Sequence, residues 1–217
     1  MSKKVAVILS GCGVYDGTEI HESVLTLLRL SQQGAQVQCF APDKPQMHVI
    51  NHLTGEETDE QRNVLVESAR IARGEVKDVR VLKAADFDAV ILPGGFGAAK
   101  NLSDFAVKGA DCTIDADVLS AIGQFRDAKK PIGLMCIAPA LSARIFGEGV
   151  QCTIGNDEGT AQAIEAMGAN HQVCTVDKVV FDAGNCLVTT PAYMLAQSIA
   201  EAATGISALV DKVLELA

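Results

Sequence analysis

Cys136 is the residue whose type and setting point most directly to chemistry. It ends a short, largely apolar run at residues 131–135, and small, helix-compatible residues follow at 138–140. Pro139 suits the first turn of a helix, where proline gives up no hydrogen bond. A cysteine on a sharp strand-to-helix turn has the arrangement of a nucleophile elbow, and the free amides of that helix are predicted to lower the pKa of the thiol. The alternative is a buried cysteine that only fills space behind a strand.

The glycine-rich loop at residues 93–97 (Pro-Gly-Gly-Phe-Gly) follows a second buried strand. It lacks the Lys-Ser/Thr of a phosphate-binding loop and the GxGxxG order of a dinucleotide site. The amides of Gly94 and Gly95 can approach a substrate oxygen closely, and the amide of Ile137 can complete an oxyanion hole. The sequence therefore predicts Gly94, Gly95 and Ile137 as substrate-binding residues. A tight turn whose glycines need positive φ is the alternative.

Two carboxylates and one histidine are candidates for proton transfer. Glu19 and Glu22 lie at the start of the first expected helix, and a carboxyl beside a cysteine can hold a proton if its surroundings are dry enough. Glu22 shares a helix side with Leu25 and Arg29, which is unusual unless it faces a pocket; a solvated first-turn glutamate is the alternative. His171 would need to fold back to the strand ends to act as a base, and an exposed loop histidine is the alternative.

Composition narrows the class of protein. A formal net charge of −9 over 217 residues argues against nucleic acid or an anionic membrane as a partner. No stretch is long and apolar enough for a membrane span, and the N-terminal run resembles neither a secretory signal nor a transit peptide, so we expect a cytoplasmic protein. Seven scattered cysteines without a CxxC pair fit a reducing compartment, and the four histidines show no zinc-type spacing, so no metal site is expected.

Strands and helices alternate along the chain. Strands are expected at residues 4–10, 36–40, 79–82, 87–92, 173–176, 179–182 and 187–190, with one more before Cys136. Helices are expected at residues 20–33, 60–73, 101–105, 117–128, 138–146, 160–167 and 192–216. In the first of these, the spacing predicts one apolar face of Ile20, Val24, Leu27 and Leu28, extended by Leu30 or Ser31.

This alternation predicts an α/β fold with a doubly wound, mostly parallel sheet and helices on both faces, in one domain over residues 1–217. The turns between the last three strands predict an antiparallel excursion. Sites in such sheets lie at the carboxyl ends of the strands, where the loops after Ser10, at 93–97 and at Cys136 are expected to converge.

At these positions the chain resembles a known group. Residues 133–136 (Gly-Leu-Met-Cys), 92–95 (Leu-Pro-Gly-Gly) and the helix of Glu22 resemble the PfpI/ThiJ superfamily, whose flavodoxin-like fold is related to class I glutamine amidotransferases. More narrowly, residues 9–22, 49–55, 96–102 and 189–196 resemble the ElbB family, and the similarity runs nearly end to end. That family is named for isoprenoid biosynthesis with an amidotransferase-like domain and is associated with glyoxalase activity.

The resemblance implies roles for individual residues. Cys136 matches the nucleophile, Glu22 the glutamate that partners it, and Gly95 and Ile137 the oxyanion-hole amides. Ile137 stands where many relatives carry a histidine, and no His-x-Glu pair near the C-terminus matches the amidotransferase triad, so glutamine hydrolysis and peptidase activity are not expected. The resemblance also implies a homodimer.

These observations lead to a functional expectation. The chain is expected to be a slow glyoxalase (a lyase without cofactors) that converts glyoxal, or other small 2-oxoaldehydes, into the 2-hydroxy acid through a Cys136 thiohemiacetal. The partner is then a small aldehyde substrate. Two alternatives stay open: a redox- or stress-responsive cysteine protein, because a low-pKa accessible thiol oxidises readily, and an amidotransferase-like accessory protein of isoprenoid metabolism.

Overall fold

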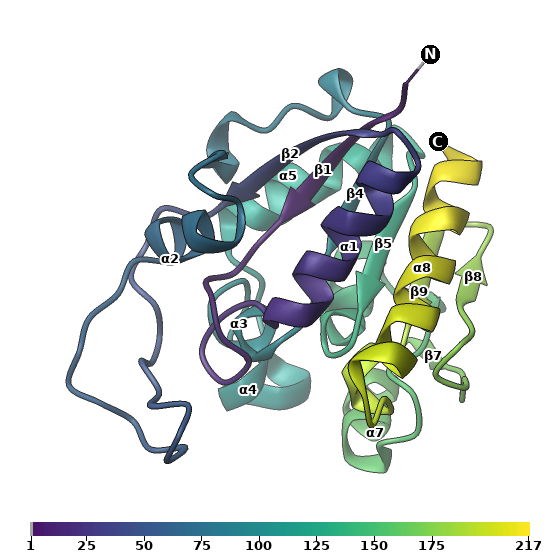
Figure 1. Cartoon of the computed structure of the whole chain (residues 1–217). Helices are drawn as coiled ribbons and strands as arrows, with labels where there is room; N and C mark the ends of the chain where they lie inside the picture. The colour runs from purple at the N-terminus through teal and green to yellow at the C-terminus, as the bar shows by residue number, and fades with distance from the viewer. Residues whose placement is uncertain (1) are drawn as a thin grey trace.

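The computed structural model describes residues 2–217 and has a seven-stranded sheet at its centre (Figure 1). The strand order is β3-β2-β1-β4-β5-β9-β8, and all neighbouring pairs are parallel except β8 and β9. The strands of this sheet are β1 (Lys4–Ile8), β2 (Gln36–Ala41), β3 (Val76–Asp78), β4 (Ala89–Leu92), β5 (Ile132–Met135), β8 (Val180–Asp182) and β9 (Leu187–Thr190). A separate parallel pair consists of β6 (Gln151–Cys152) and β7 (Asn170–His171). The predicted mostly parallel sheet and its antiparallel excursion are confirmed.

Helices cover both faces of the sheet. On one face pack α1 (Ile20–Gln32), α2 (Val64–Ile71) and α8 (Ile199–Leu216), and on the other α5 (Ala116–Asp127), α6 (Ser142–Phe146) and α7 (Glu158–Ala166). Figure 1 shows α1 and α8 side by side in front of the strands, with α5 behind them. None of the helices in residues 2–217 is long and apolar enough to cross a membrane.

The two-sided packing explains the composition of β1. Val5 and Val7 face the layer of α1 and α8, whereas Ala6 and Ile8 face the layer of α5, and all four side chains are fully buried. A parallel strand covered on both faces reads as a continuous apolar run, which is why the sequence identifies it well.

One predicted strand is a helical turn. Residues 79–82 were expected to be extended, but Val79–Val81 form the 3-10 helix η1 directly after β3. The Asp78 side chain accepts a hydrogen bond from the Arg80 amide and turns the chain there. Val79 and Leu82 are apolar because they are buried in the core, not because they belong to a strand.

Three further elements differ from the sequence prediction. Residues 101–105 mostly connect α3 (Phe96–Lys100) to α4 (Phe105–Lys108), and residues 173–176 form a loop. The last helix begins at Ile199 rather than 192, because the Ser198 side chain caps α8 by accepting a hydrogen bond from the Glu201 amide. The preceding 3-10 turn η5 (Ala192–Met194) is a separate element.

The buried face of α1 is not the one that the aliphatic spacing predicts. Ile20, Val24 and Leu28 are 42%, 48% and 50% exposed and form an outward-facing stripe. The buried residues of this helix are Glu22, Ser23, Thr26 and Leu30. Mostly small and polar side chains therefore face the sheet, together with Leu30. The prediction is wrong for Ile20, Val24 and Leu28, whereas Leu27 is partly buried against the core. On the α8 side, α1 is held by a bidentate ion pair between Arg29 and Asp211, with N–O distances of 2.8 and 2.6 Å.

Candidate active site

Cys136 lies on a sharp turn directly after β5. Its φ is +60°, a left-handed conformation that residues other than glycine rarely adopt, and its amide donates to the Thr190 carbonyl at 3.1 Å. Such strained residues gather at functional sites because the surrounding fold has to hold them in place. The predicted elbow is therefore present at Cys136. The side chain is buried, and the residue is 8% exposed.

Glu22 reaches this cysteine from the inner face of α1. It is fully buried, its Oε2 accepts the Gly94 amide at 2.9 Å, and its Oε1 accepts the Tyr193 amide at 3.2 Å. The Cys136 thiol also donates a hydrogen bond to the Glu22 carboxylate. Three different segments of the chain therefore fix this carboxyl next to the sulfur.

The dry surroundings shift both groups of this pair toward their neutral forms. Burial raises the pKa of Glu22 from 4.5 to about 7, and the neighbouring Glu19 carboxylate adds to this rise. The hydrogen bonds that the Glu22 carboxyl accepts act in the opposite direction and only partly offset it. Burial also raises the pKa of the Cys136 thiol well above 9.0, and the Glu22 charge adds to that rise. Removing the thiol proton in the resting site would place two negative charges side by side.

The raised thiol pKa corrects the prediction that the elbow ionises its cysteine. That prediction relied on the dipole of a following helix. The chain after the turn forms only the 3-10 helix η4 (Ala138–Leu141) and then the five-residue α6. Elements this short have a small dipole, and the desolvation of the sulfur outweighs it.

Two amides face the Cys136 sulfur. The N–H groups of Gly95 and Ile137 both donate toward it, from the β4 loop and from the elbow itself. Gly95 has φ +90°, and this backbone conformation is what turns its amide toward the sulfur. These are the amides that the sequence proposes for an oxyanion hole. An oxygen bound to a carbon on the sulfur would lie near them.

Gly94 has a different place in the site. Its amide is already bonded to Glu22, and its carbonyl accepts the Glu19 amide at 3.0 Å. A Cβ at this position would collide with the Cys136 Cβ and come within 2.8 Å of the Glu22 Oε2. Gly94 therefore joins the start of α1 to the elbow, and the amide available to a substrate in this loop is that of Gly95.

The loop between β1 and α1 completes the convergence of the three strand ends. The Gly97 amide donates to Gly17 at 2.8 Å and the Phe96 amide to Val14 at 2.8 Å, so the loops after β1 and β4 lie against each other. The buried Asn101 side chain donates to the carbonyls of Ser10 and Asp16, both at 2.8 Å. The expected meeting of these loops with the Cys136 turn is what the structure shows.

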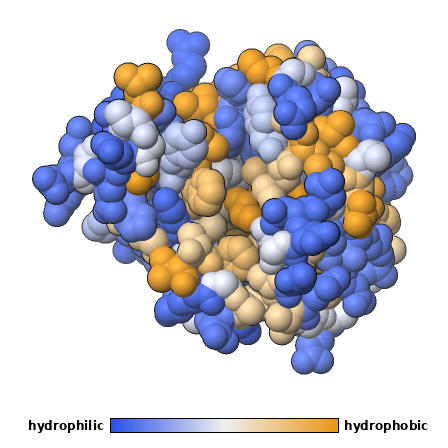
Figure 2. All heavy atoms as spheres, turned by 90° about the horizontal axis from the view of Figure 1, so that it is seen from below, coloured by the Kyte–Doolittle hydropathy of each residue, from blue (hydrophilic) through white to orange (hydrophobic). Residues whose placement is uncertain are grey.

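A cavity of about 370 Å³ opens onto Cys136 at the carboxyl ends of the strands. Its lining consists of Val14, Glu19, Gly95, Phe96, Ala99, Phe105, Ala106, Cys136, Ile137, Asp157, Thr160, Tyr193 and Met194. Figure 2 views this face from below, and it shows apolar residues gathered around a hollow with hydrophilic residues at the margins. The sulfur is therefore buried from bulk water but reachable through the cavity.

Sequence reasoning missed one member of this site, Tyr193, and named Glu19 only as a candidate for proton transfer. Tyr193 gives its amide to Glu22, lines the cavity, and bonds through its hydroxyl to the His21 Nδ1 at 2.8 Å. Glu19 also lines the cavity and caps α1 by accepting the Glu22 amide at 2.6 Å. Tyr193 lies three residues beyond the end of β9, the strand beside β5, so the strand order is the signal that would have found it.

His171, the candidate base, and Cys12, on the loop after β1, lie outside this cavity. The His171 Nε2 accepts the Ile154 amide at 3.3 Å in the β6–β7 region, so it does not serve Cys136 as a base. Cys12 is not among the lining residues, and burial raises the pKa of its thiol. Within the described residues, no three His, Cys, Asp or Glu side chains are placed to hold a metal ion.

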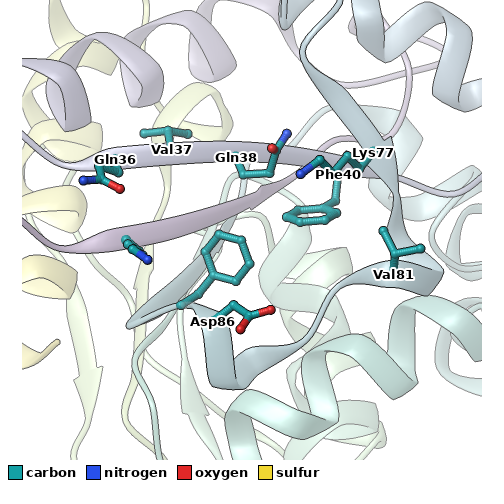
Figure 3. Close-up of a pocket in the computed structure, with 9 residues that line it drawn as sticks. Gln36, Val37, Gln38, Phe40, Lys77, Val81 and Asp86 are labelled. Carbon is teal, nitrogen blue, oxygen red and sulfur yellow. The ribbon is translucent and has the colours of Figure 1, made fainter.

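A second cavity of about 390 Å³ lies on another part of the molecule (Figure 3). Its lining comes from the β1 and β2 strands and from residues 77–87, with the side chains Lys4, Gln36, Val37, Gln38, Phe40, Lys77, Val81, Asp86 and Phe87. It contains no cysteine or histidine, so it offers no nucleophile comparable to Cys136.

Comparison with known proteins gives close relatives. The rat "ES1 protein homolog, mitochondrial" is 52% identical over 223 residues, covering 98% of this chain and 84% of the relative. The human "Glutamine amidotransferase-like class 1 domain-containing protein 3, mitochondrial" is 53% identical over 223 residues, covering 98% and 83%. The chain belongs to the ES1 family. No family model matches it.

One solved structure is similar in sequence and fold, and others share the fold alone. The isoprenoid biosynthesis protein with amidotransferase-like domain from Ehrlichia chaffeensis superposes with a TM-score of 0.93 at 38% identity and covers 99% of each chain. Drosophila melanogaster DJ-1beta shares the fold, with a TM-score of 0.54 at 18% identity over all of this chain and 96% of its own. The resemblance at family level and the amidotransferase-like fold are confirmed, and the likeness to DJ-1beta shows a shared fold.

The ES1 relatives contradict one expectation from the sequence. The rat, human and zebrafish proteins are all named mitochondrial. The expectation of a cytoplasmic protein rested on the N-terminal residues and the free cysteines, and the names of these relatives overturn it.

Proposed function

We propose that this ES1-family protein is a glyoxalase that adds water across a 2-oxoaldehyde and yields the 2-hydroxy acid. The observation that carries the proposal is the fully buried Glu22 carboxyl, whose pKa is raised to about 7 beside the Cys136 thiol. A base with a pKa near the working pH combines a useful basic fraction with an effective driving force for proton transfer.

The first step joins the sulfur to the aldehyde. Because the pKa of the Cys136 thiol is raised, the resting sulfur carries its proton, and Glu22 removes that proton as the sulfur attacks. A bond forms between sulfur and the aldehyde carbon, and the aldehyde oxygen takes a proton to give a thiohemiacetal. The amides of Gly95 and Ile137 stabilise the negative charge that develops on this oxygen.

The second step moves a proton between adjacent carbons. Glu22 takes the proton from the carbon bound to sulfur, which gives an enediol, and a proton is returned to the neighbouring carbon. The product is a 2-hydroxy thioester on Cys136. Water then breaks the carbon–sulfur bond, so that glyoxal plus one water becomes glycolate and a proton, with no net oxidation.

The site disfavours a redox sensor and glutamine hydrolysis. A redox sensor needs an exposed thiolate, whereas Cys136 is 8% exposed and its thiol pKa is raised. Glutamine hydrolysis needs a histidine at the nucleophile and a cation for the substrate carboxylate. The cavity lining within the described residues contains no histidine, lysine or arginine.

Product formation tests the proposal. Cys136→Ala is expected to lower glycolate formation from glyoxal at least about a thousandfold, because the attacking atom is lost. Cys186→Ala, at a partly exposed cysteine far along the chain, is the control and keeps full activity. For the wild type, kcat/KM should rise with pH through about 7, since the ionised Glu22 is the base. Full glycolate formation by Cys136→Ala would refute the proposal.

A further inference from the structure

The cavity above Cys136 is mostly apolar. Its walls come from the loop after β1, from α3 and α4, and from η5. The apolar lining side chains are Val14, Phe96, Ala99, Phe105, Ala106, Ile137 and Met194. Two phenylalanine rings and several aliphatic groups thus border the space in front of the sulfur, beside the ring of Tyr193. Such a lining favours a ligand with an apolar body and a few polar atoms.

The charged groups of the lining are all acidic. Glu19 and Asp157 are its only ionisable side chains besides Cys136 and Tyr193. Two hydrogen bonds from Thr160 lower the pKa of Asp157, so this carboxyl is ionised at neutral pH. The Glu19 carboxylate is close enough to the reacting pair to raise the pKa of Glu22.

The nearby basic side chains lie outside the cavity, although the His21 Nδ1 comes within 4.0 Å of the Glu19 Oε1. His21 bonds to the Tyr193 hydroxyl at 2.8 Å and is not a lining residue. Lys100 donates to the Tyr15 carbonyl at 2.9 Å and lines a separate hollow beside Phe96. An anionic substrate would therefore meet carboxylates and no cation in front of Cys136.

The volume exceeds what a two-carbon substrate needs. The cavity measures about 370 Å³, within the range of about 300–1,000 Å³ that is typical of pockets for drug-sized ligands. Glyoxal has only four heavy atoms, and a water-sized particle takes up about 30 Å³. Glyoxal would leave most of the apolar lining without a partner, so the binding energy available from that lining would go unused.

Resting on the proposed function, we infer that the preferred substrate is an uncharged 2-oxoaldehyde with an apolar substituent about the size of a phenyl ring. Glu19 and Asp157 exclude anionic carbonyl compounds. The aldehyde end reaches the Cys136 sulfur between the amides of Gly95 and Ile137, and the substituent lies against Phe105 and its neighbours.

A substrate comparison on the full chain tests the size of the substituent. With phenylglyoxal, the product is mandelate, and kcat/KM is expected to exceed that for glyoxal at least about tenfold, with one mandelate enantiomer formed. Ala106→Trp fills part of the cavity and should lower the phenylglyoxal-to-glyoxal ratio of kcat/KM at least about tenfold. Val107→Trp is the matched control: Val107 is 67% exposed on the same α4 helix and does not line the cavity, so the ratio should stay the same.

Alkylation of Cys136 tests the charge without requiring turnover. Iodoacetamide and iodoacetate differ in charge, and the modified peptide is quantified by mass spectrometry at low ionic strength, relative to free cysteine. Wild type should disfavour iodoacetate at least about fivefold, and Asp157→Asn should relieve much of this discrimination. Glu158→Gln is the matched control, because it removes the same charge at the next residue, outside the lining.

The outcomes separate the two proposals. If no 2-oxoaldehyde is converted in a Cys136-dependent way, the proposed function fails and the substrate assignment falls with it. If glyoxal is converted as efficiently as phenylglyoxal and Ala106→Trp leaves the ratio unchanged, the function stands and the inference on the substituent is overturned. Equal alkylation by the two reagents overturns the exclusion of anions by Asp157 and Glu19, whatever the turnover.

Discussion

The buried carboxyl of Glu22 should make the protein less stable as the pH rises. Its pKa in the folded chain is raised from 4.5 to about 7. Between these values the folded state binds more protons than the unfolded state, so the free energy of unfolding falls with increasing pH. The stabilising contribution of the neutral carboxyl is fully present below pH 4.5 and is lost as the pH rises through about 7. This direction is opposite to that of a carboxylate in a salt bridge.

The two pKa values set the size of the effect. Integrating proton binding from about pH 5 to about pH 8 gives a loss of about 2.5 kcal/mol from this one group, as an order of magnitude. For a chain of this length, that corresponds to a melting temperature lower by about 5–10 °C. Glu22→Gln removes the titration and should abolish this part of the pH dependence.

The variant also changes the hydrogen bonds of the site. Glutamine accepts only one of the two amides of Gly94 and Tyr193 that the carboxylate now accepts. An unpaired buried amide costs about 1–3 kcal/mol, but it does so at every pH. The absolute stability of Glu22→Gln is therefore less informative than the difference between its stabilities at the two pH values.

Urea unfolding at fixed protein concentration, followed by circular dichroism, measures this difference. Glu158→Gln is the control for the loss of a solvent-facing carboxylate and should keep the wild-type pH dependence. The acidic groups with lowered pKa values, such as Asp78, Asp104 and Asp157, act in the opposite direction but complete their titration at lower pH. Identical pH dependence in wild type and Glu22→Gln would refute a buried carboxyl with a raised pKa.

Three further predictions concern the packing of the site, its thiol and the outer face of α1. Gly94→Ala should lose stability by about 1–3 kcal/mol in urea unfolding, together with most of the activity, because its Cβ collides at Cys136; Gly159→Ala, with no neighbour closer than 3.8 Å, is tolerated. In wild type, the rate of iodoacetamide alkylation of Cys136 should stay low through neutral pH. In Glu22→Gln, the rise of this rate with pH should begin at a lower pH than in wild type, because the neighbouring charge is gone. Half-maximal alkylation below neutral pH in wild type would contradict the raised pKa of the thiol. We also propose a homodimer that buries the exposed aliphatic stripe of α1, so Val24→Glu should shift sedimentation from dimer to monomer; a wild-type monomer at micromolar concentration would contradict this.

The elbow and its neighbouring loop could be predicted from the sequence because their signals are local. The strand-to-helix turn at Cys136 is specified within a few residues, by an apolar run, the cysteine and a proline in the following turn. The same holds for the glycines after β4, where the φ of +90° at Gly95 requires glycine. Parallel topology then brings the two loops together at one edge of the sheet.

The ionisation state of Cys136 could not be predicted in this way. It depends on how much water the rest of the fold removes, and on a carboxyl whose second hydrogen-bond donor, Tyr193, lies 171 positions further along the chain. The prediction from the local sequence included the dipole of the helix that follows the cysteine, but it could not include this desolvation. The sign of the pKa shift was therefore wrong although the residue was correctly placed.

The error on α1 has a physical reason that also concerns function. Periodicity assigns the aliphatic side of a helix to the core, because burying apolar surface is favourable. In α1 the inner side instead carries Glu22 and small residues such as Ser23 and Thr26, which leave the carboxyl room to meet Cys136. A buried carboxyl that costs stability above pH 7 and a solvent-facing aliphatic stripe both run against what folding alone favours. The buried carboxyl is explained if Glu22 serves as the base. The exposed aliphatic stripe is explained if a second copy of the chain covers it.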